Sequence, residues 1–340
     1  MPVKVLHVGV GIRGTHWLDF VRDHPDTVSV GCVDPDSEAL NKARDKLKDS
    51  ECKYFSDMDE ALNECHADAV LIASPSRFHK DHATAALRKG LDVMVEKPFA
   101  TSVAEALTVL REAEGAGRQI VVAENYRYWP AERTMRQMIL AGELGRIDNV
   151  LLVDHRNMPS YTEGPWLAKI DYPQLGEIGI HHFDSLRALL GVRPTSMTTK
   201  VWNPPKSDYQ HGACTQALMD FEGINVNYLG TLTSDRFAFT LRVEGEAGSL
   251  WSNRKYVLFR AAGKRFYRPV KRVKVPAGDE ASYPKGGTSS LLNSLRDAVV
   301  HGTQAETSGS DNLWTLAMVE AGKRSDQERR TVSIEEIYKP

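Results

Sequence analysis

The glycine spacing G-x-G-x-x-G near the N-terminus is the first pattern in the sequence whose residue types could do chemistry. It follows the apolar run 3–8 directly and opens a stretch with the apolar periodicity of a helix. Between a strand and a helix, such glycines form a tight turn, let a pyrophosphate approach the backbone and allow close helix–strand packing. The spacing therefore predicts a dinucleotide-binding loop rather than a ligand-free turn. Its expected cofactor contacts are Gly9, Gly11, Ile12, Arg13 and Gly14.

Asp34 ends the second predicted strand, 20 residues after Gly14. An acid at this distance is expected to hold the ribose hydroxyls of the dinucleotide. Its charge repels a 2′-phosphate, and residues 35–37 contain no Arg or Lys that would bind one, so the sequence favours NAD over NADP. The alternative role of Asp34, capping the next helix, can be filled by Asp36 or Ser37 instead.

Lys97 lies between an acid and a proline, directly after the predicted strand 92–95. Ligands of an open α/β sheet bind outside the carboxyl ends of its strands, so this lysine is expected at the same edge as the glycine loop. There it can donate a hydrogen bond to a substrate oxygen and exchange a proton once it is desolvated. The alternative, a solvated surface lysine, fits this position less well. The same edge is expected to hold the cofactor contacts Ser74, Pro75, His79 and Glu96.

Residues 1–124 alternate short β-branched runs with amphipathic stretches of helix length, which is typical of parallel strands joined by crossover helices. This alternation predicts a doubly wound parallel sheet, the Rossmann arrangement, in a first domain that binds NAD. Capping patterns that begin at Ser56 and Ser102 mark helix starts, and Gly90 marks a helix end. The predicted strands are 3–8, 28–34, 53–55, 69–73, 92–95 and 119–123.

The pattern changes at residue 125, so 125–340 is expected to form a second, α+β domain. Stretches such as 225–233 and 236–243 alternate apolar and polar residues and have no helix between them. Successive strands of this kind predict a large, open, mostly antiparallel sheet whose half-polar face meets solvent or a partner subunit. Further predictions are helices at about 131–141, 181–190, 289–300 and 310–325, a strand at 146–156 and a short strand or extended end at 331–337.

Length, charge and composition narrow the function classes. A chain of 340 residues with 41% hydrophobic and 26% charged residues is typical of a globular protein with about two domains. Its 43 basic and 45 acidic residues give a net charge of −2, so we expect no nucleic-acid or membrane partner from bulk electrostatics. No apolar stretch approaches the ~20 residues of a membrane-spanning helix, and the early apolar run leaves no room for a signal peptide. Four scattered cysteines without C-x-x-C spacing predict a reducing compartment, the cytoplasm.

Several segments together resemble one enzyme family. The glycine loop, Pro75, His79, the triplet 96–98 and the segment 176–184 are similar to the glucose–fructose oxidoreductase and inositol dehydrogenase (Gfo/Idh/MocA) family of NAD(P)-dependent oxidoreductases. Segments 125–127, 144–147 and 318–325 agree, so the resemblance spans essentially the whole chain. It implies a second domain that covers the nicotinamide and supplies substrate contacts, and a last helix, about 310–325, that packs back on the first domain.

The resemblance also implies roles for individual residues. Lys97 positions a substrate hydroxyl and assists proton transfer, and His181 is the base, since histidine titrates near neutrality while NAD takes the hydride. Four residues before the histidine, where the family usually has Asp, this chain has Glu177, a further catalytic and substrate residue. Asp184 is an alternative partner for the histidine, because it lies on the same helical face. The remaining expectations are the cofactor contact Asn125, the substrate contacts Tyr126 and Arg127, and a structural role for His182.

These residues predict an NAD-dependent dehydrogenase that oxidises a secondary hydroxyl of a sugar, a polyol or a sugar derivative. The alternatives are a sugar lyase or glycosidase that retains NAD and oxidises its substrate transiently, and a non-catalytic NAD-binding regulator. No metal is expected, because neither His79 with His82 nor His181 with its acidic neighbours has a further ligand at supporting spacing. The open sheet of the second domain predicts a homodimer or homotetramer through that sheet.

Overall fold

The chain folds into two compact units in a computed structural model that describes residues 1–48, 51–159, 167–263, 270–275 and 284–338. The first unit comprises Met1–Asn125 with Ser282–Leu313, and the second comprises Tyr126–Ala281 with Trp314–Pro340. The sequence treats 125–340 as one domain, whereas the contacts of residues 282–313 assign them to the first unit. Helix α9 (Gly309–Glu328) begins among those residues and continues into the second unit.

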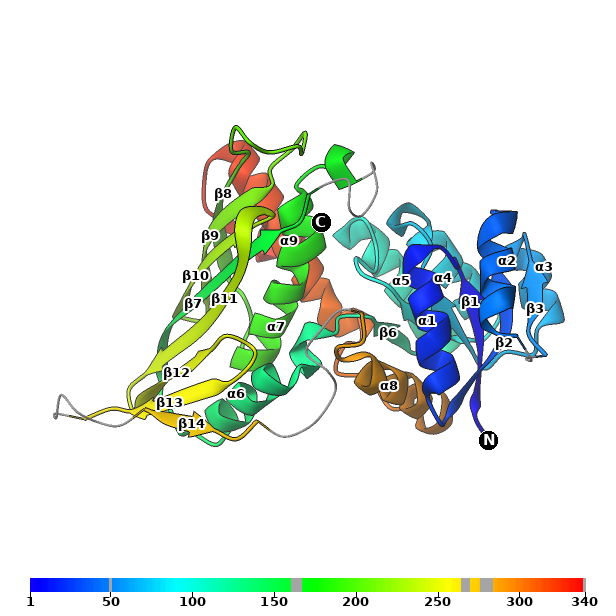
Figure 1. Cartoon of the computed structure of the whole chain (residues 1–340), viewed down its shortest axis with the longest axis horizontal. Helices are drawn as coiled ribbons and strands as arrows, with labels where there is room; N and C mark the ends of the chain where they lie inside the picture. Colours follow the sequence, from blue (N-terminus) through cyan, green and yellow to red (C-terminus); the bar gives the residue numbers. More distant parts are fainter. Residues whose placement is uncertain (49–50, 160–166, 264–269, 276–283, 339–340) are drawn as a thin grey trace. The chain divides into compact units, whose positions relative to one another are not determined.

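The first unit contains a six-stranded parallel sheet in the order β3-β2-β1-β4-β5-β6 (Figure 1). This is the strand order of a doubly wound dinucleotide-binding fold, and it confirms the predicted fold class. All six predicted strands are present, with ends within about two residues of the expected ones. The strands are β1 (Val3–Val8), β2 (Thr27–Val33), β3 (Lys53–Phe55), β4 (Ala69–Ile72), β5 (Asp92–Val95) and β6 (Ile120–Val122). The helices are α1 (Ile12–Asp23), α2 (Ser37–Lys46), α3 (Met58–Glu64), α4 (His79–Arg88), α5 (Val103–Ala116) and α8 (Thr288–His301).

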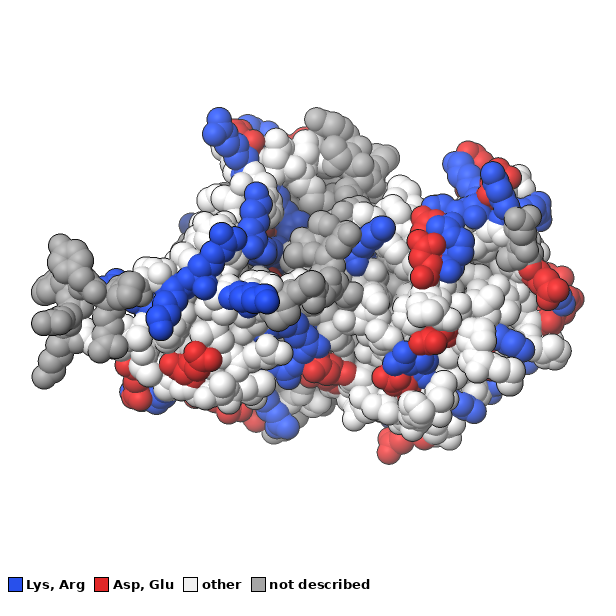
Figure 2. Space-filling model, turned by 60° about the horizontal axis from the view of Figure 1, so that its bottom comes forward, with Lys and Arg blue, Asp and Glu red and all other residues white. Residues whose placement is uncertain are grey.

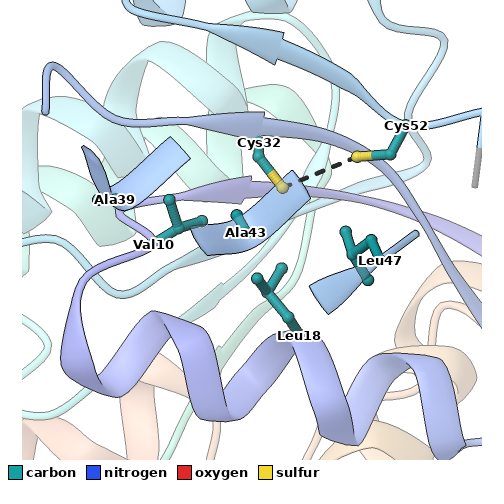
Figure 3. Close-up of a cluster of buried hydrophobic side chains, with 7 residues drawn as sticks. All are labelled: Val10, Leu18, Cys32, Ala39, Ala43, Leu47 and Cys52. Carbon is teal, nitrogen blue, oxygen red and sulfur yellow. Dashed lines mark hydrogen bonds between the residues drawn. The ribbon is translucent and has the colours of Figure 1, made fainter. Parts of the chain in front are cut away.

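A cluster of small buried side chains packs α1 and α2 against the end of β2 (Figure 3). In this cluster the sulfur atoms of Cys32 and Cys52 lie 3.7 Å apart as free thiols. The packing fixes the two helix starts that flank the carboxyl end of β2, where the glycine loop and Asp34 lie. The cluster consists of Val10, Leu18, Cys32, Ala39, Ala43, Leu47 and Cys52.

The second unit contains a nine-stranded sheet in the order β14-β13-β12-β11-β7-β10-β9-β8-β15. Its described neighbours pair antiparallel except β10 and β7, which are parallel, so the expectation of a mostly antiparallel sheet is confirmed. The predicted strand 225–233 is wrong in one respect, since it divides at Leu232 between two strands. The strands are β7 (Ile147–Asn157), β8 (Ser196–Trp202), β9 (Cys214–Phe221), β10 (Ile224–Thr231), β11 (Thr233–Gly245), β12 (Gly248–Ser252), β13 (Val257–Ala261), β14 (Lys271–Val273) and β15 (Val332–Ser333).

Helices cover one face of this sheet and leave the other face open (Figure 1). The covering helices are α6 (Pro130–Leu140), α7 (Ile180–Leu190) and the larger part of α9. Burial alternates along the central strands accordingly: Val150, Leu152 and Asp154 of β7 are buried, and Leu151 is exposed. The tail forms β15 and the short helix α10 (Glu335–Tyr338).

The two predicted helix caps differ in outcome. Ser102 caps α5 as predicted, because its hydroxyl accepts a hydrogen bond from the Glu105 amide at 3.2 Å. The predicted cap at Ser56 is wrong by one residue: the carboxylate of Asp57 caps α3 by accepting from the Glu60 amide at 2.9 Å. An aspartate and a serine are both good N-caps, so the sequence alone could not choose between adjacent candidates.

Exchanging these two neighbours for alanine tests the assignment. Asp57→Ala is expected to lower the free energy of unfolding by about 1 kcal/mol, because the first turn of α3 loses its cap. Ser56→Ala, on the adjacent exposed position, is expected to stay within about 0.5 kcal/mol of the parent protein. Urea denaturation of both variants measures the difference, and equal effects would contradict the assignment.

Candidate functional site

The three loop glycines meet three different steric demands. Gly9 has φ +85°, and a Cβ there would lie 2.4 Å from the amide nitrogen of Ser74. A Cβ on Gly14 would lie 2.0 Å from the carbonyl oxygen of Gly9, whereas a Cβ on Gly11 would meet nothing within 4 Å. Gly9 therefore makes the turn and Gly14 permits close helix packing. Gly11 leaves its backbone open on the side from which a pyrophosphate would approach.

Asp34 supports this loop from the end of β2. One carboxylate oxygen accepts the amide of Val10 at 2.9 Å, and the other accepts the amide of Asp36 at 3.0 Å. The cap of α2 is Asp36, whose side chain accepts from the Glu38 amide at 2.9 Å, so Asp34 is not needed as a helix cap. No described side chain caps the N-terminus of α1. These groups fit a dinucleotide: open backbone donors for phosphate and an acid beside the ribose position.

Glu96 connects the start of α1 to the segment that carries Lys97. Its carboxylate accepts from the guanidinium of Arg13, from the indole N–H of Trp17 at 2.7 Å and from the Lys97 amide at 3.2 Å. Burial raises the pKa of Glu96, but the charge and hydrogen bond of Arg13, the hydrogen bond of Trp17 and the charge of Lys97 together lower it more, so the carboxyl is ionised at neutral pH. The Arg13 guanidinium also lies 5.1 Å from the Trp17 ring centre.

His79 links the loops that follow β4 and β5. Its ring is 1% exposed, with Nδ1 2.8 Å from the carbonyl oxygen of Pro98 and Nε2 2.7 Å from that of Ser74. Burial lowers the pKa of the ring, and the two carbonyl oxygens oppose that shift. The peptide bond between Lys97 and Pro98 is cis. The imidazole thus holds the Ser74 loop and the Lys97 segment at one fixed separation.

The other predicted contacts of this unit lie at the same edge or next to it. Ile12 is 71% exposed beside the glycine loop, and Pro75 is also exposed. Asn125 is 8% exposed, and its side-chain amide donates to the Gly286 carbonyl at 2.5 Å. That bond anchors the end of the β6 segment to the residues that precede α8.

In the second unit, Glu177 and His181 lie on either side of a change in helix geometry. Residues Gln174–Gly179 form a π-helical turn that runs directly into α7, which carries the histidine. Such turns often occur at functional sites. Gly230 of β10 makes room for the side chain of Gln174 in this turn, because a Cβ there would lie 1.9 Å from its Nε2. Glu177 is partly exposed and His181 is 8% exposed.

Tyr126 provides the surface on which His181 packs. The two rings stack with centres 4.4 Å apart and planes 16° apart. The ring of Trp129 lies 4.1 Å from that of Tyr126. The Tyr126 hydroxyl accepts a hydrogen bond from Arg156 at 3.1 Å, which fixes the far end of the ring.

Arg127, expected to contact substrate, forms a buried ion pair. Its guanidinium donates to both carboxylate oxygens of Asp184, at 2.7 and 2.5 Å, and the two side chains are 5% and 0% exposed. Thr315 also donates to Asp184, at 3.3 Å. Asp184, expected as an alternative partner of His181, has both oxygens engaged in this pair. The pair fixes α7 to the short helix 126–128 that carries Tyr126.

His182 occupies a buried polar cluster behind His181. Its Nδ1 lies 3.0 Å from the Tyr228 hydroxyl, and its Nε2 lies 3.7 Å from the Asp154 carboxylate. Burial, with the charges of Arg254 and Arg156, holds the pKa of His182 well below its ordinary value, so the ring is neutral. Asp154 accepts from Arg156 at 2.6 Å.

Sequence reasoning missed several residues around this histidine pair. Asp154 could have been found from the sequence. It is a charged residue at a strand position that should be buried, two residues after Leu152 and four after Val150. Arg254 and Glu132 gave none, because they are far apart in sequence and meet only in the fold. Among the described residues no group of three or more His, Cys, Asp or Glu side chains could hold a metal ion. None of the described helices combines the length and apolarity needed to cross a membrane.

Comparison with known proteins identifies relatives over the whole chain. An uncharacterised protein, y4oX of Sinorhizobium fredii, is 27% identical and covers 99% of this chain and 97% of its own length. The D-apiose dehydrogenase of Paraburkholderia graminis is 26% identical, over 97% of this chain and 89% of its own. The crystal structure of an Agrobacterium radiobacter oxidoreductase, in complex with NAD+, L-tartaric acid and magnesium, superposes with TM-score 0.89 at 20% identity, covering 99% of each chain.

Two family models match the two parts of the sequence. The model for the oxidoreductase family with an NAD-binding Rossmann fold matches residues 3–124, and the model for the GFO/IDH/MocA C-terminal domain matches residues 133–251. The first match contains the glycine loop, Asp34 and Lys97, and the second contains Glu177 and His181. The chain therefore belongs to the GFO/IDH/MocA family and is an NAD-binding oxidoreductase.

Proposed function

We propose that this oxidoreductase is an NAD-dependent dehydrogenase that oxidises a secondary hydroxyl group of a sugar, a polyol or a sugar derivative. The first unit holds NAD, and the second unit supplies the substrate contacts. The observation that carries the proposal is the fixed separation of Lys97 from the glycine loop, through Glu96 and His79, at the carboxyl edge of a dinucleotide-binding sheet. The D-apiose dehydrogenase among the relatives supports a sugar-like substrate.

Two side chains handle the hydroxyl group. NAD, when bound, supplies a hydride acceptor. The Lys97 ammonium donates a hydrogen bond to the substrate oxygen and stabilises negative charge that develops there. His181 accepts the hydroxyl proton, a role that suits an imidazole held in one orientation by the Tyr126 ring. Glu177, one turn before it and partly exposed, contacts the substrate or orients the histidine.

We assign the remaining predicted residues by what their side chains do. Direct cofactor contacts are expected from groups that are accessible at the edge of the sheet. Groups that are buried and already hydrogen-bonded within the protein are expected to hold those contacts in place. His79 and Arg127 belong to the second kind, because His79 binds two carbonyl oxygens and Arg127 binds Asp184. Glu96 and Asn125 are also buried and hydrogen-bonded, so they are proposed to hold the cofactor contacts in place. The proposed direct cofactor contacts are Gly9, Gly11, Ile12, Arg13, Gly14, Asp34, Ser74, Pro75 and Lys97, and the proposed substrate contacts are Lys97, Tyr126, Glu177 and His181.

We also propose the cytoplasm as the location and no nucleic-acid or membrane partner. All four cysteines are free, including the adjacent thiols of Cys32 and Cys52, which suits a reducing compartment. Figure 2 shows acidic and basic side chains on both halves of one face, in keeping with the net charge of −2.

Removing the amine of Lys97 tests the chemistry. Lys97→Met is expected to reduce turnover of a responsive sugar or polyol at least ~100-fold, because proton handling and charge stabilisation are lost. NADH affinity, measured by fluorescence titration, is expected to stay within about twofold, which is ~0.4 kcal/mol. Lys89→Met, which removes a lysine paired with Asn63 on the surface, is the matched control. Full turnover in Lys97→Met would overturn the assignment. Tight NADH binding by the unmodified protein without turnover of any polyol would favour the regulator.

A charge change at Asp34 tests the preference for NAD. Asp34→Asn keeps an oxygen that can accept the Val10 amide but removes the negative charge that repels a 2′-phosphate. The ratio of NADPH to NADH affinity is expected to rise about tenfold, equivalent to ~1.4 kcal/mol. The control is Asp36→Asn, two residues away at the cap of α2, for which the ratio should not change. An unchanged ratio in Asp34→Asn would contradict a role for its charge in cofactor choice.

The open face of the nine-stranded sheet is proposed to join two copies of the chain. On this face Leu218 of β9 is 55% exposed and Leu151 of β7 is 39% exposed, and both are register partners of Asn227 of β10. In this cross-strand row the two leucines flank Asn227, and a second copy that covers the row would remove their exposed apolar surface from water. A lasting dimer needs roughly 1,000 Å² or more of buried surface, which a sheet of this width can supply.

Charge introduced at the centre of that row tests the dimer. The double variant Leu151→Asp/Leu218→Asp is expected to sediment as a monomer, while the parent protein sediments as a dimer or tetramer. Leu140→Asp, at the end of α6, changes a leucine that is even more exposed, 68%, away from the sheet and should leave the mass unchanged. A parent protein that sediments as a monomer would contradict the proposal.

A further inference from the structure

We propose that Arg254 is a positioning residue for His181: its guanidinium holds the Tyr126 ring on which the imidazole stacks and supplies a fixed positive charge beside it. The inference rests on the proposed function, since that function makes His181 the proton acceptor. Arg254 follows β12 and belongs to the second unit together with Tyr126 and His181.

The Arg254 guanidinium lies over three aromatic rings. Its central carbon is 4.6 Å from the ring centre of Tyr126, 4.3 Å from that of Trp129 and 3.7 Å from that of Phe239. A planar cation over aromatic faces is attracted by their negative centres and excludes water from between them. The side chain is 7% exposed, so these contacts replace its hydration.

A buried carboxylate holds the guanidinium in this place. Glu132 of α6 accepts from the Arg254 Nε at 2.9 Å, and its side chain is 4% exposed. Burial raises the pKa of Glu132, and the charge of Arg254 opposes that shift. A buried cation needs such a partner, because an unpaired buried charge is strongly unfavourable. The pair therefore locates the positive charge within a narrow region over Tyr126.

The backbone at Arg254 also indicates that this side chain matters. Its φ of +71° lies in the left-handed region, where glycine or asparagine is usual and a long side chain is disfavoured. The hydroxyl of Ser252 accepts the Arg254 amide at 2.9 Å and supports that conformation. An arginine in a conformation that disfavours it points to a function of its guanidinium.

Tyr126 transmits the position of Arg254 to His181. The imidazole stacks on the Tyr126 ring with 4.4 Å between ring centres, and Arg156 fixes the hydroxyl end of that ring. Since Arg254 and His181 each lie within 5 Å of the same ring centre, the guanidinium carbon is within about 9 Å of the imidazole centre. A buried charge at this distance is only weakly screened by salt.

Other charges near His181 are arranged in pairs. Arg127 pairs with Asp184, and Arg156 pairs with Asp154. The further titratable groups packed nearby are Glu177 in the turn before α7, the neutral ring of His182, and the hydroxyls of Tyr126 and Tyr228. Against this background Arg254 disfavours the imidazolium form of His181, and Glu132 favours it, so the two partners have opposite effects.

Two substitutions with opposite expected shifts test the proposal. In Arg254→Met the titration midpoint of the His181 ring signals, followed by NMR, should move to higher pH by about half a unit or more. In Glu132→Gln, which keeps the shape of the side chain, it should move to lower pH. Arg254→Lys keeps the charge and should restore the midpoint, but it cannot stack as a plane and should recover only part of the turnover. Arg260→Met, an exposed arginine of β13, is the control.

Steady-state kinetics separate positioning from folding. Arg254→Met should lower kcat about tenfold or more and move the acid limb of kcat/KM to higher pH, while NADH affinity stays within about twofold. A residue that only stabilises the fold would lower the melting temperature without moving either titration. Unshifted midpoints in both Arg254→Met and Glu132→Gln would overturn the proposal. If Arg254→Met does not fold, Glu132→Gln still decides the proposal by the direction of its shift.

The variant His181→Asn distinguishes this inference from the proposed function. It also assigns the NMR signals, because the signals of the ring disappear. If His181→Asn keeps its turnover, the proposed role of the histidine fails, whatever Arg254 does. If His181→Asn is inactive and the Arg254 variants titrate like the parent protein, only the role of Arg254 fails.

Discussion

The buried carboxylate of Glu96 is the interaction on which the cofactor edge depends. Removing an ionised carboxylate from water is costly unless several donors surround it. Here the donors come from Arg13 and Trp17 of α1 and from the Lys97 backbone. Because each donor is needed, the first turn of α1 and the segment after β5 have one relative arrangement. The backbone of the glycine loop and Lys97, for which we propose contacts with a pyrophosphate and a substrate hydroxyl, are therefore held together within the first unit.

The second unit uses buried ion pairs in the same way, around aromatic rings. The pairs Arg127–Asp184 and Arg254–Glu132 each join two segments that are distant in sequence, and the pair Arg156–Asp154 lies within β7. Such pairs add little stability compared with apolar packing of the same volume, and loss of one partner costs roughly 3–5 kcal/mol. Their benefit is a fixed geometry: a ring or a loop can occupy only the position in which every charge is matched. Tyr126 and His181 lie where the three pairs meet.

Local patterns in the sequence predicted the helices and strands, while contacts between residues distant in sequence could not be predicted from them. Glycine spacing and β-branched runs were sufficient for the six parallel strands and the loop, since both depend on a few adjacent residues. The parallel pairing of β10 with β7 could not be predicted. The alternation of apolar and polar residues indicates which face of the sheet a side chain lies on, but not which strand is the neighbour. For the same reason the ion pair of Arg127 could not be predicted, since its partner Asp184 lies 57 residues away and carries no local signal.

The pairing of arginines with carboxylates also affects which ligands the proposed site can select. Every described arginine around Tyr126 has a buried carboxylate partner, so these groups present no excess positive charge to a ligand. A neutral polyol then loses nothing to electrostatic repulsion, and an anion gains nothing from bulk attraction, in keeping with a chain whose net charge is −2. Discrimination among such substrates has to come from hydrogen-bond geometry, because a polar group fixed in a dry site strongly rejects a ligand that leaves it unpaired. Fixed rings and paired charges are the means by which a protein keeps its donors and acceptors in the positions that such selection requires.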